Sequence, residues 1–224
     1  MIKAVIFDMD GLLVDSEPLW RKAEIKVFGE LSISMTEEMC NEVMGLRIDE
    51  VVHYWHRRFS WDKKISEATV VSCIMNTMLN LIASEAVAMR GVHETLDYFK
   101  SKNIRIALAS SSSMALIDAV LKKLDIRSYF EVLRSAETEH FGKPHPAVFI
   151  KTAQSLGVEP EDCLVFEDSS FGLIAAKAAL MKAVAVPDPN YYGNPKFGIA
   201  DACLHNLLEF DDVLFHKLCG DLKE

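Results

Sequence analysis

Short apolar runs alternate with longer amphipathic segments over most of the chain. Runs rich in apolar and β-branched residues, each the length of a buried strand, occur at Lys3 to Phe7, Arg105 to Ala109, Val132 to Leu133, Cys163 to Phe166 and Ala183 to Val186. Apolar residues recur at helical spacing over Met114 to Leu124, Ala147 to Leu156 and Gly172 to Met181. Such alternation is typical of right-handed βαβ units, so it predicts an α/β fold with a parallel central sheet flanked by helices.

Residues 16–86 depart from this alternation. Apolar residues fall at helical spacing from Trp20 to Phe28 and from Val70 to Ile82, and no strand pattern separates them. We therefore predict a small helical cap of residues 16–86 inserted after the first strand, with residues 1–15 and 87–224 forming the α/β core. Open α/β sheets bind ligands at the carboxyl ends of their strands, so an insertion at this point is expected to act as a lid.

Charge and cysteine usage narrow the class of protein. The chain has 33 acidic and 24 basic side chains, a net charge of −9, which disfavours nucleic-acid polymers and anionic membranes as partners. The five cysteines show no metal-binding spacing and are expected to be free thiols.

The N-terminal apolar stretch is too short for a signal peptide, and no run approaches the roughly 18 apolar residues of a membrane span. We expect a soluble cytoplasmic protein, and a monomer because no unexplained apolar seam remains.

Acidic residues follow two of the predicted strands. Asp8 and Asp10 come directly after the first strand, and Glu167 and Asp168 end a later one. Parallel strands deliver their carboxyl ends to one edge of the sheet, so these groups are expected to meet there. Crowded carboxylates favour a cation, and Mg²⁺ typically takes one or two protein carboxylates together with water and phosphate oxygens. The first pair alone would equally fit acids that cap the next segment or are solvated.

Hydroxyl and ammonium groups occur near the same predicted edge. Ser110 to Ser113 follow a strand and precede a helix, where hydroxyls and free N–H groups can hold an anion, although one of these serines is expected to cap the helix. Lys143 lies in a rigid Lys-Pro-His-Pro stretch before another helix. Taken alone, Lys143 would more simply be a solvated lysine.

In this order, the segments FDMDGLLVDSEP, ALASSSS, GKPHP and FEDSSFG resemble the four motifs of the haloacid dehalogenase superfamily of phosphohydrolases. The resemblance implies a Rossmann-like core and a reaction through an aspartyl-phosphate. Asp8 would be the nucleophile, and Asp10 would be the general acid and base. The resemblance also implies that Mg²⁺ is bound by Asp8, by the backbone carbonyl of Asp10 and by Asp168, with Glu167 in support. It further implies that phosphate is bound by Ser110, Ser111 and Lys143.

The helical insertion resembles the cap of β-phosphoglucomutases and related sugar-phosphate phosphatases. Those mutases carry a catalytic histidine at the position aligned with Trp20, which favours hydrolysis over isomerisation. DSEPLW, GLRIDEVV and NPKF are similar to bacterial 2-deoxyglucose-6-phosphate phosphatases, also called hexitol phosphatases. Arg47, in GLRID, would contact substrate or would be an ordinary surface arginine.

The sequence thus predicts a Mg²⁺-dependent phosphatase acting on small sugar or polyol phosphates, such as 2-deoxyglucose 6-phosphate and hexitol phosphates. The alternatives are a phosphosugar mutase, another small-ester phosphatase such as a phosphoglycolate phosphatase, and a sugar-phosphate-binding regulator that has lost its chemistry.

Overall fold

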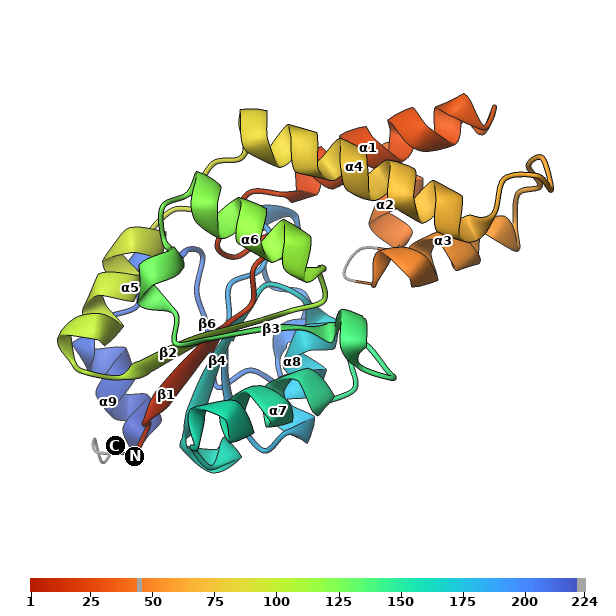
Figure 1. Cartoon of the computed structure of the whole chain (residues 1–224). Helices are drawn as coiled ribbons and strands as arrows, with labels where there is room; N and C mark the ends of the chain where they lie inside the picture. The colour runs from red at the N-terminus through yellow and green to blue at the C-terminus, as the bar shows by residue number, and fades with distance from the viewer. Residues whose placement is uncertain (44–45, 221–224) are drawn as a thin grey trace.

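The computed structural model describes residues 1–43 and 46–220. Within these residues the centre of the protein is a parallel sheet of six strands in the order β3-β2-β1-β4-β5-β6 (Figure 1). The strands are β1 (Ala4–Phe7), β2 (Arg105–Ser110), β3 (Val132–Ser135), β4 (Cys163–Glu167), β5 (Lys182–Ala185) and β6 (Ala202–Cys203). The predicted α/β class and parallel sheet are confirmed.

Helices cover both faces of this sheet. They are α5 (Val92–Ser101), α6 (Met114–Lys123), α7 (Ala147–Leu156), α8 (Ser170–Ala178) and α9 (Asp212–Cys219). Alternate residues of β1 point to opposite faces: Ala4 and Ile6 pack with α7 and α8, whereas Val5 and Phe7 pack in the cluster that contains α5, α6 and α9. Every side chain of β1 is fully buried, which explains its continuous apolar run.

The strand register aligns the residues that follow the strands. Phe7 pairs with Leu108 of β2 and with Phe166 of β4, so Asp8 lies level with the ends of both neighbours. The backbone N–H of Asp8 donates to the carbonyl of Phe166 at 3.0 Å, which extends the ladder by one residue. The carboxyl edge of the sheet therefore collects chemistry-bearing side chains from three strands.

The predicted helical insertion follows β1. It contains α1 (Glu17–Glu30), α2 (Glu37–Glu42), α3 (Ile48–His56) and α4 (Glu67–Glu85), which lie together beyond the sheet's carboxyl edge (Figure 1). Helix α4 packs on α1, on α3 and on α6 of the core. The two connections to the core run side by side, with Asp15 N donating to Val87 O at 3.0 Å and Met89 N to Leu13 O at 3.1 Å. We propose that the boundaries of the cap, residues 16–86, lie at this pair of connections.

Some elements were not expected from the sequence. Strand β6 has two residues and α9 has eight, both too short for a clear periodic pattern. Helix α8 begins at Ser170, two residues before the predicted start, because the Ser169 hydroxyl caps it by accepting from Gly172 N at 3.0 Å. The connecting segments also contain short 3₁₀ helices at Arg127–Tyr129, Ala136–Thr138, Pro160–Asp162, Pro189–Tyr191, Pro195–Phe197 and Leu207–Glu209.

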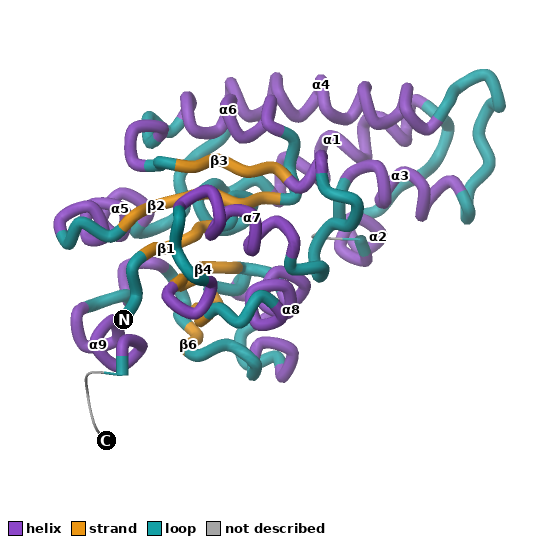
Figure 2. Tube along the Cα trace, turned by 60° about the horizontal axis from the view of Figure 1, so that its bottom comes forward, coloured by secondary structure: helices purple, strands orange, loops and turns teal. Residues whose placement is uncertain are grey.

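None of the five cysteines forms a disulfide, as predicted; all of them lie in the described ranges. Across residues 1–43 and 46–220, no helix combines the length and the apolar character that a membrane crossing requires. Figure 2 shows the insertion from a second direction, with α4 passing above the core helix α6.

Candidate active site

A buried lysine joins two carboxylates at the carboxyl edge of the sheet. Lys143 Nζ donates to Asp8 Oδ1 and to Glu167 Oε1, both at 2.6 Å, and to the carbonyl of Ala109 at 3.3 Å. Asp8 and Lys143 are each 6% exposed, and Glu167 is fully buried. All three ammonium hydrogens thus have acceptors, so Lys143 is fixed in place and is not the solvated lysine that its motif alone would allow.

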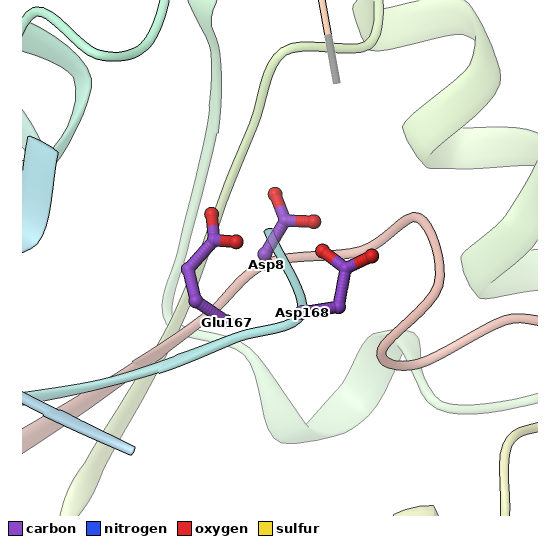
Figure 3. Close-up of side chains that lie close together, drawn as sticks. All are labelled: Asp8, Glu167 and Asp168. Atoms are coloured by element: carbon purple, nitrogen blue, oxygen red, sulfur yellow. The ribbon is translucent and has the colours of Figure 1, made fainter. Parts of the chain in front are cut away.

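Carboxylates outnumber the ammonium at this point. Ligand atoms of Asp8, Glu167 and Asp168 lie within 4.8 Å of one another, and Figure 3 shows the three carboxyl groups gathered at the ends of β1 and β4. Burial raises the pKa of Asp8 to about 8, with Glu167 and Asp10 adding to the rise and Lys143 opposing it. Burial, with Glu167 and Asp8 next, also holds the pKa of Asp168 well above its usual range. Three ionised carboxylates would carry more negative charge than one lysine balances, so the pKa values rise where no cation is bound.

A hard divalent cation fits this donor set. Carboxylate oxygens are the ligands that Mg²⁺ prefers, and a cation would offset the excess charge. Gly11 keeps the space open: its φ is +72°, and a Cβ there would lie 2.3 Å from Asp168 Oδ2. Both oxygens of Glu167 are already engaged within the protein, because Oε1 accepts from Lys143 and Oε2 accepts from the N–H and the hydroxyl of Ser169 at 3.0 Å. Its place beside a metal would be a supporting one.

Asp10 lies between the insertion and the core. Its Oδ1 accepts from the Ser16 hydroxyl at 2.7 Å and from the Trp20 indole N–H at 3.0 Å, while Oδ2 accepts from the hydroxyls of Ser112 at 2.7 Å and Ser110 at 3.4 Å. The side chain of Asp10 is therefore held apart from the three gathered carboxyl groups. Asp10 would therefore bind a metal through its backbone carbonyl oxygen and not through its carboxylate, as the motif resemblance implies.

Four consecutive serines at the end of β2 make different contacts. Ser110 accepts from the N–H of Ser112 at 3.0 Å, which closes the turn after the strand. Ser113 caps α6 by accepting from Leu116 N at 3.4 Å, as one serine was expected to do. Ser110, Ser111 and Ser112 line the same pocket as Asp8 and Lys143. The hydroxyls thus meet the lysine and the acids, which is the arrangement expected for a phosphate site.

Arg47 also lines this pocket, but part of its guanidinium is engaged elsewhere. Nη1 donates to the carbonyl of Glu139 at 3.0 Å and Nη2 to Asp49 at 2.9 Å. Its side chain packs against Gly142, where a Cβ would lie 3.2 Å from it. Arg47 thus links the start of α3 to the core loop that carries Lys143, a role that sequence reasoning missed. Gly45 of the same motif lies outside the described residues.

Sequence reasoning also missed a polar face of α1. Glu17, Arg21 and Glu24 line the pocket beside Trp20. Burial, followed by the charge of Asp10, raises the pKa of Glu17 to about 7. These positions follow one another at helical spacing, but the polar stripe of an amphipathic helix ordinarily faces solvent, so the sequence alone did not mark them.

Comparisons with known proteins place the chain in a family. The sequence model of the haloacid dehalogenase-like hydrolases matches residues 5–186. The chain belongs to the haloacid dehalogenase-like hydrolases. It is 40% identical over 211 residues to hexitol phosphatase B of Escherichia coli (strain K12), covering 93% of this chain and 94% of that protein. It is 32% identical over 192 residues to the phosphorylated carbohydrates phosphatase of Thermotoga maritima, covering 80% and 82%.

A solved structure supports the same assignment. The β-phosphoglucomutase of Clostridium difficile matches with a TM-score of 0.83 and 25% identity, over 99% of this chain and 98% of that one. The resemblance read from the four motifs is thereby confirmed. This haloacid dehalogenase-like hydrolase is a phosphatase, since its family and its named relatives agree.

Proposed function

We propose that the protein is a cytoplasmic, Mg²⁺-dependent phosphatase that hydrolyses small sugar or polyol phosphates through an aspartyl-phosphate. The observation that carries this proposal is Lys143 held between Asp8 and Glu167, beside Asp168 and opposite the hydroxyls that surround Asp10. The substrate class rests on the printed names of the hexitol and phosphorylated-carbohydrate phosphatases that the chain resembles.

The first half-reaction uses Asp8 as nucleophile. One oxygen of its carboxylate accepts from Lys143, and the other would attack phosphorus, forming an acyl-phosphate bond while the ester P–O bond breaks. Asp10 would donate a proton to the departing alcohol oxygen. The hydroxyls of Ser110 and Ser111 would hold the phosphoryl oxygens, and the positive charge of Lys143 would help to offset the negative charge of the phosphate.

The second half-reaction regenerates the enzyme. Asp10, now deprotonated, would take a proton from water as that water attacks phosphorus and the bond to Asp8 breaks, which releases inorganic phosphate. Asp8, Asp168 and the Asp10 carbonyl would hold Mg²⁺, with Glu167 supporting them. When bound, the ion supplies positive charge that favours the ionised form of Asp8 despite its burial. The helices of the insertion would exclude bulk water.

Trp20 favours hydrolysis over the mutase alternative. A mutase must move protons at the hydroxyls of a reoriented sugar, and histidine, which both donates and accepts, suits that task. The indole N–H is a donor only, and here it is directed to Asp10. We therefore infer that this position orients the acid–base residue.

The test is phosphate release with Mg²⁺ from 2-deoxyglucose 6-phosphate, hexitol phosphates, fructose 1-phosphate and phosphoglycolate. We expect turnover of the sugar or polyol esters, loss of turnover with a chelator, and no turnover by Asp8→Asn. Asp118→Asn, at an exposed position on α6, is the matched control and should behave as wild type. Undiminished hydrolysis by Asp8→Asn would refute the mechanism. Net conversion of β-glucose 1-phosphate to glucose 6-phosphate in excess of released phosphate would favour the mutase.

A further inference from the structure

Helix α1 contributes polar side chains to the wall of the pocket that contains Asp8 and Asp10. Trp20 and Glu24 are four residues apart on this helix and both line the pocket. Trp20 bonds Asp10, and the helix then runs away from the sheet (Figure 1). Glu24 therefore lies about 6 Å farther along the helix axis from the acid–base residue than Trp20 does.

Glu24 is a buried acid with an unused oxygen. Its side chain belongs to a residue that is only 6% exposed, and among residues 1–43 and 46–220 its Oε2 has no hydrogen-bond partner. The Cys40 thiol, a weak donor, is its side-chain hydrogen-bond partner. A buried carboxyl oxygen without a hydrogen-bond partner is unfavourable, so its presence calls for a ligand that satisfies it.

The surroundings of Glu24 are otherwise mostly apolar. Val43, Val51 and Met75 line the same pocket, and Arg21 is the nearby cation. Burial raises the pKa of Glu24 to about 7, with Cys40 and then Arg21 opposing the rise. A carboxyl group in such a place can accept a hydrogen bond from a ligand hydroxyl, while the apolar wall contacts the carbon chain.

We propose that Glu24 determines specificity by hydrogen-bonding a hydroxyl of the substrate at the end remote from the phosphate. This inference rests on the proposed function, which places the ester oxygen beside Asp10. A substrate spanning from Asp10 past Trp20 to Glu24 must be a chain of sugar or hexitol length that carries hydroxyls at its far end. Phosphoglycolate is too short to make the contact.

The experiment compares two substrates in Mg²⁺: a hexitol 6-phosphate, which can reach Glu24, and p-nitrophenyl phosphate, which has no hydroxyl to offer. Glu24→Gln keeps the shape of the side chain. We expect it to lower kcat/KM for the hexitol phosphate by about 5- to 10-fold, chiefly through KM, because the amide oxygen still accepts the hydrogen bond but lacks the charge that strengthens it. Its kcat/KM for p-nitrophenyl phosphate should stay within about threefold of wild type, which also shows that the variant is folded.

Glu30→Gln, at the exposed end of the same helix, is the control for removing one negative charge. Equal losses on both substrates would assign Glu24 a purely structural role and overturn the proposal, as would no loss on either. These results differ from a failure of the proposed function, in which the wild-type enzyme itself would not hydrolyse the hexitol phosphate.

Discussion

The burial of Glu24 should be measurable as pH-dependent stability. In the folded protein its pKa is raised to about 7 from an ordinary 4.5, first by burial. Cys40 on α2 and Arg21 on α1 oppose the rise, and Glu17 on α1 is a neighbouring acid whose own pKa is raised in part by Glu24. Between these two pKa values the folded state binds more protons than the unfolded state does. The free energy of unfolding therefore falls as pH rises through this window.

The size of the effect follows from the same two values. The pKa of Glu24 is 4.5 in the unfolded chain and about 7 in the folded protein. Its titration therefore makes the free energy of unfolding about 2.5 kcal/mol lower at pH 8 than at pH 5. Glutamine does not titrate, so any packing effect of Glu24→Gln is the same at every pH. The stability of the variant relative to wild type should thus improve by about 2.5 kcal/mol across this interval.

The assay is urea unfolding of wild type, Glu24→Gln and the exposed control Glu30→Gln at several pH values without substrate or metal, analysed at a common m-value. Glu30→Gln measures how much of any change comes from removing an acidic side chain at an exposed position. A Glu24→Gln difference that changes with pH by no more than about 0.5 kcal/mol beyond that of Glu30→Gln would contradict the predicted effect of burial on Glu24.

Two further substitutions test the catalytic centre. Lys143→Met should lower the free energy of unfolding by about 3–5 kcal/mol in metal-free buffer, because Asp8 and Glu167 lose their buried counter-charge. A loss below about 1 kcal/mol in a urea titration would contradict this expectation. Trp20→Phe removes the N–H that donates to Asp10 Oδ1, so kcat should fall about 3- to 10-fold with little change in KM. An unchanged kcat would show that the indole does not position the acid–base residue.

The core of the fold and the sheet-edge part of the site could be predicted from sequence because both depend on local patterns. Continuous apolar runs mark parallel strands, and parallel strands must deliver their ends to one edge. Asp8 and Asp168 follow two such runs that pair directly with each other, so their meeting required no knowledge of the rest of the chain.

The cap side of the site could not be predicted in this way, because it depends on how helices separated by loops pack on each other and on the core. Arg47 shows the difference. The motif resemblance led us to expect either a substrate contact or a surface arginine, yet the hydrogen bond of Arg47 to Glu139 spans 92 residues of sequence and depends on how α3 packs over the core. Glu24 likewise looks like an ordinary surface acid in the sequence, and its burial arises where α1 faces α2 and α4.

The buried acids form a single system. In the described parts of the chain, the carboxyl groups whose pKa is raised are those of Asp8, Glu17, Glu24 and Asp168, and all four line this one pocket. Near neutral pH each of them makes the empty pocket harder to fold, and each becomes favourable only with a partner. A cation suits the end formed by Asp8 and Asp168, and a hydroxyl group suits the end at Glu24. A hydroxylated phosphate ester bound with Mg²⁺ satisfies both ends at once, so substrate recognition and stabilisation of the folded pocket depend on the same contacts.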